Sequence, residues 1–143
     1  EKYDFSKHQI IKGHIAERTS DAVLSKLSAV FERYDCRYAL TGLSAAWVLS
    51  KFATFRTSTV YLQDLPEHYL LKELNFVKGD KGSNVWLVIP NDEGVFDGLS
   101  VRQGINCVHP VQAYVDLKAH PERAKEAAKE LRVQYLTWRN DAA

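Results

Sequence analysis

The 143-residue chain has no methionine and only two cysteines, Cys36 and Cys107. Since translation begins with methionine, we expect the sequence to be a piece of a longer protein or a trimmed chain. Two cysteines at this spacing match no metal motif, and they are too few to staple a small secreted domain. Both thiols are therefore expected to be reduced and buried, in a cytoplasmic protein.

Long apolar runs and a strong net charge are also missing. No stretch of about 18 apolar residues is present, which excludes a membrane-spanning helix, and residues 1–20 show no signal-peptide pattern. The 19 basic and 18 acidic residues leave a formal charge of +1, so any attraction to nucleic acid must come from a local patch. A composition that is 45% hydrophobic and 26% charged is typical of one ordinary globular domain.

Hydrophobic spacing predicts helices that alternate with strands. Helices are expected over residues 21–34, 43–52, 67–74, 110–119 and 121–138. Strands are expected over residues 36–40, 57–63, 76–77, 84–89 and 105–108, and residues 10–15 read as a strand or a tether. Turn residues predict two hairpins, one joining 76–77 to 84–89 and one joining 95–96 to 99–101 around Asp97 and Gly98.

These elements indicate an α/β (α+β) fold, with a mixed β-sheet, flanking helices and a C-terminal helical pair. The predicted domain covers residues 21–143. Residues 1–20 are predicted to be an N-terminal extension or the remnant of an upstream domain.

The turn between the strand at 36–40 and the next helix is one candidate ligand site. Gly42 permits a tight turn, a helix N-terminus attracts phosphate, and Thr41 and Ser44 supply hydroxyl groups. Nucleotidyltransferases follow such a turn with a strand carrying two alternating carboxylates that hold Mg²⁺. The strand at 57–63 has no carboxylate, and Asp64 stands alone after it. The residues therefore favour a tight turn without a ligand over a phosphotransfer site, and nucleotide binding at Gly42 stays open.

No catalytic, metal-binding or cofactor-binding residue is predicted. The five histidines show no zinc spacing and are expected at surface or capping positions. In the helix at 110–119, Gln112 and Asp116 lie four residues apart and are expected to form a hydrogen bond, with Tyr114 facing inward. Pairing of Asp116 with Lys118 or Arg123 is the alternative. A packed helix corner is the favoured interpretation of Gln112, Tyr114 and Asp116, and an interaction surface is the alternative.

Lys125, Lys129 and Arg132 fall on one stripe of the last predicted helix, beside a stripe of glutamates. The favoured interpretation is a solvated face of mixed charge. The alternative is a surface that binds nucleic acid or an acidic partner.

Three segments resemble AbiEi-type antitoxins. They are Tyr-Ala-Leu-Thr-Gly-Leu-Ser-Ala-Ala at 38–46, Val-His-Pro-Val-Gln-Ala-Tyr-Val-Asp-Leu at 108–117 and Pro-Glu-Arg-Ala-Lys-Glu-Ala-Ala at 121–128. The resemblance spans residues 30–136. It implies the C-terminal antitoxin domain of a bacterial type IV toxin–antitoxin system, with a nucleotidyltransferase-like fold that lacks catalytic residues and is not an enzyme.

In that family the antitoxin counteracts a nucleotidyltransferase toxin and represses its own operon through an N-terminal winged helix. Only 20–30 residues precede the matched region, so binding of operon DNA is expected to need an upstream domain. Direct contact with the toxin is left open. The alternatives are an active nucleotidyltransferase that uses Ser44, Asp64 and a later carboxylate, or a DNA- or RNA-binding module that uses Lys125, Lys129 and Arg132.

Overall fold

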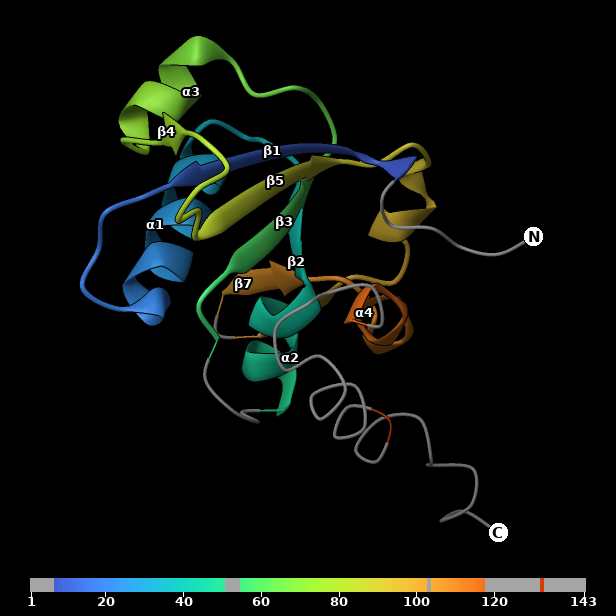
Figure 1. Ribbon diagram of the computed structural model, residues 1–143. Helices are drawn as coiled ribbons and strands as arrows, with labels where there is room; N and C mark the ends of the chain where they lie inside the picture. The colour runs from blue at the N-terminus through green and yellow to red at the C-terminus, as the bar shows by residue number, and fades with distance from the viewer. Residues whose placement is uncertain (1–6, 51–54, 103, 118–131, 133–143) are drawn as a thin grey trace, which may run out of the picture.

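The computed structural model describes residues 7–50, 55–102, 104–117 and 132 (Figure 1). In this part of the chain, seven strands form one mixed sheet in the order β4-β1-β5-β3-β2-β7-β6. The strands are β1 (Gln9–His14), β2 (Tyr38–Thr41), β3 (Ser58–Leu62), β4 (Val77–Lys78), β5 (Val85–Ile89), β6 (Ser100–Arg102) and β7 (Ile105–Cys107). The helices are α1 (Ser20–Arg33), α2 (Gly42–Ser50), α3 (His68–Glu73) and α4 (Pro110–Leu117), with a short 3-10 helix, η2 (Glu93–Phe96).

The predicted mixed sheet with flanking helices is confirmed. The predicted helix over 121–138 lies outside the described residues except for Arg132, so only α4 represents the expected C-terminal helical pair. Lys125 and Lys129 lie outside them as well.

The centre of the sheet is β2 and β3, which are antiparallel to each other and buried along their whole length. Helices α1 and α3 cover one face, and α2 and α4 cover the other (Figure 1). Since side chains alternate along a strand, Tyr38 on β2 points toward α1, while Thr41 on β2 and Tyr61 on β3 point toward α4. The α2–α4 face therefore carries the candidate residues of both predicted sites.

Helix α1 has well-defined ends. Thr19 caps its start by accepting a hydrogen bond from the Ala22 N–H at 3.1 Å. At its end Asp35 adopts the left-handed conformation with φ +54°, and the Cys36 N–H donates to the Phe31 carbonyl at 2.8 Å. This is a Schellman cap with an aspartate where glycine is usual.

Both predicted hairpins are wrong, although most of the strands exist. The apolar residues of β1 insert between β4 and β5, so β4 pairs with β1 and not with β5. The turn between β4 and β5 gives no sign of this insertion. Residues 95–96 belong to η2, and β6 pairs instead with β7. Gly13 allows β1 to pass under the chain after α3, since a Cβ at this position would overlap the ring of Phe76.

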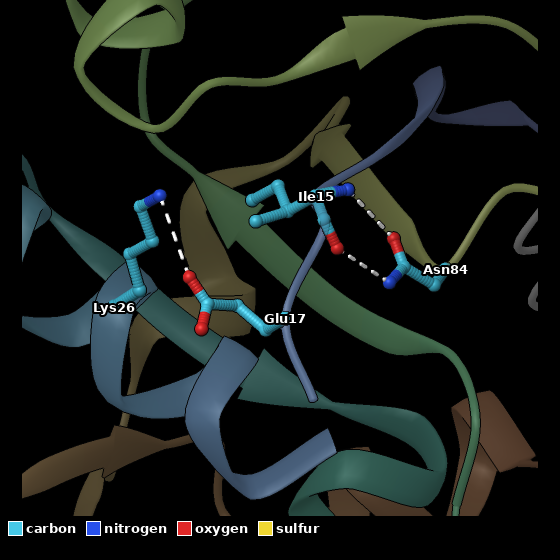
Figure 2. A network of polar contacts seen from close by, with 4 residues as sticks. All are labelled: Ile15, Glu17, Lys26 and Asn84. Carbon is cyan, nitrogen blue, oxygen red and sulfur yellow. Dashed lines mark hydrogen bonds and ion pairs between the residues drawn. The ribbon is translucent and has the colours of Figure 1, made fainter. Parts of the chain in front are cut away.

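The N-terminal segment is built into the sheet as far as it is described. β1 pairs with β5 over five residues, and Ile15 is fully buried. Figure 2 shows the Asn84 side chain facing the Ile15 backbone, where its amide accepts from the N–H and donates to the carbonyl, each at 2.9 Å. Nearby, Lys26 Nζ lies 3.6 Å from Glu17 Oε2. The expected boundary at residue 20 therefore does not separate residues 9–15 from the rest of the fold.

Both cysteines are free thiols; Cys107 is buried as expected, but Cys36 is only half-buried. Within the described ranges, none of the helices has the length and apolar character needed to span a membrane.

Candidate functional site

The turn between β2 and α2 is closed to solvent. Gly42 has φ +63°, a conformation that favours glycine, and Thr41 and Ser44 are both fully buried. The Ser44 hydroxyl donates to the Thr41 carbonyl at 2.8 Å and accepts from the Thr59 N–H at 3.2 Å. The Ser44 hydroxyl is therefore used to join α2 to both central strands.

The carboxylate of Asp116 on α4 brings the two predicted sites together. Its Oδ2 accepts from the Thr41 hydroxyl at 2.5 Å and from the Tyr61 hydroxyl at 2.7 Å. Its Oδ1 accepts from the Gln112 amide at 3.1 Å, which confirms the hydrogen bond predicted from their spacing. Asp116 is only 3% exposed, and a buried carboxylate is costly unless such donors surround it.

His8 extends this network to the start of the chain. Its Nε2 lies 3.4 Å from the Tyr61 hydroxyl, and its Nδ1 accepts from the Asn91 N–H at 3.1 Å. Since Nδ1 acts as an acceptor, the neutral ring carries its proton on Nε2, which then donates to Tyr61. His8, Tyr61 and Asp116 thus connect the residue before β1 to β3 and α4. We call these three residues, with Thr41 and Gln112, the Asp116 network.

Two members of the Asp116 network were not identified from the sequence. His8 was expected at a surface or capping position, but it is 5% exposed, so this expectation is wrong for His8. His109 does cap a helix, since its Nδ1 accepts from the Val111 N–H at the start of α4. Tyr61 alternates with Thr59 along β3, but its bond to Asp116, 55 residues away, has no local signal in the sequence.

A second polar cluster lies on the opposite face of the sheet. The Tyr38 hydroxyl is 2.8 Å from the Ser28 hydroxyl, 3.1 Å from Glu32 Oε2, and accepts from the Asn106 N–H at 3.2 Å. Burial is the largest cause that raises the pKa of the Tyr38 phenol. The neutral phenol therefore ties α1 to β2 and β7.

Two further predicted site residues, Tyr114 and Arg132, belong to the described part of the chain. Tyr114 is half-buried on α4, and Arg132 is exposed. The predicted inward orientation of Tyr114 is thus met in part.

On the α2–α4 face of the sheet, the polar groups are mainly hydroxyl groups that surround the carboxylate of Asp116. β3 presents Thr59 and Tyr61 there, and the Thr59 hydroxyl is buried without a hydrogen-bond partner. No group of three or more His, Cys, Asp or Glu side chains that could hold a metal ion occurs within the described ranges. The Asp116 network positions α4 against the two central strands.

No family model, curated protein or solved structure matches the chain.

Proposed function

We propose that the chain is a non-catalytic antitoxin and transcriptional-regulator domain of a bacterial type IV toxin–antitoxin system, of the AbiEi type. It counteracts a nucleotidyltransferase toxin in the cytoplasm, and its core is a nucleotidyltransferase-like scaffold without a reaction centre. Operon DNA is its proposed nucleic-acid partner, bound through a domain upstream of this sequence.

The observation that carries the proposal is the contact between Thr41 and Asp116. Thr41 lies in the first segment that resembles the antitoxins, and Asp116 lies in the second, 75 residues later. Gln112 and Asp116 of the second segment also bond to each other. A buried hydrogen-bond network stabilises the fold only when all of its members are present. The Thr41–Asp116 contact therefore gives a structural reason for two distant segments to form one signature.

The face of β3 supports a role that does not involve catalysis. Thr59 and Tyr61 alternate on β3, the strand that the proposed nucleotidyltransferase-like scaffold would use for the carboxylates that hold Mg²⁺. The Tyr61 hydroxyl already donates to Asp116. Neutral hydroxyls do not supply the negative charge that two cations on a triphosphate require.

The test is co-expression in a bacterial host with the nucleotidyltransferase encoded beside this gene. Expression of the toxin alone is expected to stop growth, and co-expression of the intact chain is expected to restore colony counts. A frame-shifted copy of the chain serves as the control. Continued growth arrest in the presence of folded chain would refute the proposal, as would the absence of a neighbouring nucleotidyltransferase gene.

Two binding measurements separate the proposal from its alternatives. Calorimetric titration with ATP or CTP and Mg²⁺ is expected to show no binding, whereas Mg²⁺-dependent binding that Asp64→Ala abolishes would indicate an active nucleotidyltransferase. A gel shift with operon DNA at two salt concentrations tests the basic stripe. A shift that high salt abolishes and that requires Lys125, Lys129 and Arg132 would indicate a nucleic-acid-binding module.

A further inference from the structure

A hollow of about 240 Å³ opens on the α1–α3 side of the sheet, away from the Asp116 network. It lies where α1 gives way to β2 and where β3 leads into α3. Its lining includes three carboxylates, from Asp35, Asp64 and Glu67, and we call it the acidic hollow. All three side chains belong to exposed residues, so they are accessible to a partner.

The charge of the acidic hollow is opposite in sign to that of the chain. Arg37 is the one basic residue among the described residues that line it, so this part of the lining has a formal charge of −2, against +1 for the whole chain. The Arg37 guanidinium is already engaged beyond the lining. It lies 4.6 Å from the centre of the Phe96 ring and 4.0 Å from Glu93 Oε1.

The floor of the acidic hollow is apolar. Leu62 and Leu70 are nearly fully buried beneath it, and Cys36 is half-buried beside them. Burial, and then the negative charges of Asp35 and Asp64, raise the pKa of the Cys36 thiol, so both carboxylates act on the floor of the hollow. An apolar floor under a negative rim suits a side chain with an aliphatic stem and a cationic head.

Exposed apolar side chains continue outward from the hollow. Leu65 is 57% exposed and Tyr69 is 52% exposed, and both belong to the lining. Tyr34 packs edge-on against Tyr69, with ring centroids 5.2 Å apart. These are three of the six large hydrophobic residues that are exposed in the described part of the chain. Such a gathering, rich in tyrosine, is typical of protein-binding surfaces.

We propose that the acidic hollow docks an arginine or lysine side chain of a partner protein, whose neighbouring apolar residues cover Leu65, Tyr69 and Tyr34. The methylene stem packs on the floor, and the cationic head meets the carboxylates of Asp35, Asp64 and Glu67. A free polyamine supplies the same cation but leaves the exposed rings and Leu65 uncovered, which is why the occupant is a protein segment. This inference does not depend on the proposed antitoxin function.

The test uses the intact, ¹⁵N-labelled chain and the capped peptide acetyl-Gly-Leu-Arg-Leu-Gly-amide at low salt. Amide shifts are expected at Cys36, Asp64 and Tyr69. The same peptide with citrulline, which is neutral and nearly the same shape as arginine, is expected to bind about fivefold more weakly, as the loss of a partly exposed ion pair predicts. Equal affinity of the two peptides would overturn the proposal, as would spermidine that binds as tightly as the arginine peptide.

Charge variants provide the matched control. Asp35→Asn with Asp64→Asn removes two charges from the acidic hollow, and asparagine tolerates the left-handed conformation of residue 35. Asp80→Asn with Asp97→Asn removes two charges from exposed turns elsewhere. Only the first pair is expected to weaken peptide binding, and equal losses from both pairs would refute a specific site.

A single variant keeps the test decisive if the first pair does not fold. Glu67→Gln changes an exposed residue whose side chain makes no capping hydrogen bond to α3. It is expected to weaken binding of the arginine peptide and to leave the citrulline peptide unaffected. Unchanged binding of both peptides would count against the proposal.

Discussion

Asp116 accepts more hydrogen bonds than the sequence predicted for it. Three side chains from α4 and the two central strands donate to its two oxygens. The spacing of Gln112 and Asp116 revealed one of them. The other two come from Thr41 and Tyr61, 75 and 55 residues away, and no local pattern in a single sequence reports contacts over that distance.

Thr41 and Thr59 offer a controlled test of this network, because they are paired partners on β2 and β3 and are both buried. Thr41→Val removes a donor to a buried carboxylate and is expected to lower the free energy of unfolding by about 2 kcal/mol. Thr59→Val removes a hydroxyl that has no partner and is expected to be neutral or stabilising by up to about 1 kcal/mol. Urea denaturation of both variants measures the difference. Equal destabilisation would show that the Thr41–Asp116 bond contributes nothing specific.

Tyr61→Phe extends the test to a second donor. Tyr61 and Thr41 share one oxygen of Asp116, so the effects of Tyr61→Phe and Thr41→Val on the free energy of unfolding are expected not to add. A double-mutant cycle by urea denaturation checks this. Strict additivity would mean that the two hydroxyls act independently.

Asp35 occupies a position where glycine is the usual residue. Its φ of +54° is strained for a residue with a Cβ, so Asp35→Gly is expected to raise the free energy of unfolding by about 0.5 kcal/mol. Asn75 ends α3 in the same way, with φ +55°, and Asn75→Gly is expected to give a similar gain in urea denaturation. Only Asp35→Gly is expected to weaken peptide binding as well, because Asn75 does not line the acidic hollow.

The pH dependence of Cys36 alkylation follows from its surroundings. A raised pKa means less thiolate at pH 8, so iodoacetamide is expected to modify Cys36 more slowly than an unperturbed thiol, with a rate midpoint at higher pH. Asp35→Asn with Asp64→Asn removes the charge contribution and is expected to lower that midpoint. Cys36→Ser identifies the signal, and an unchanged midpoint in the double variant would show that burial alone controls the thiol.

The helices and strands themselves were largely predictable, and their pairing was not. Apolar spacing and β-branched runs are local properties, so the expected ranges agree with α1, β3 and α4 to within a few residues. Turn residues suggested that neighbouring strands pair, but β1 enters from the far end of the described chain and separates β4 from β5. The glycine of β1 that lies under Phe76 gave no signal, because the close approach arises only after both segments have folded.

Asn84 is the side chain that extends the pairing of β1 with β5. Its amide replaces one step of the strand ladder by bonding both backbone groups of Ile15. Asn84→Ala is expected to lower the free energy of unfolding by about 1 kcal/mol and to speed hydrogen exchange at the Ile15 amide. Asn91→Ala is the control, since Asn91 is exposed and the bond it gives His8 comes from its backbone. Unchanged exchange at Ile15 in Asn84→Ala would contradict this role.

Removal of the N-terminal strand tests how far the domain extends. A chain that begins at Ser20 lacks β1, the buried side chain of Ile15 and the His8 end of the Asp116 network. It is expected to lose the cooperative thermal transition followed by circular dichroism, whereas a chain that begins at Lys7 is expected to keep it. An intact transition in the shorter chain would support a domain boundary at residue 20.

The position of β2 and β3 at the middle of the sheet has a consequence during protein synthesis. These strands and α2 between them are consecutive in the chain, but their outer neighbours are not: β5 begins at Val85 and β7 at Ile105. While the ribosome adds the residues from 63 to 105, an apolar strand pair leaves the exit tunnel with unpaired backbone on one or both sides. Unpaired strand edges associate with one another, so the yield of native protein depends on how quickly translation covers this interval and on chaperones that shield it.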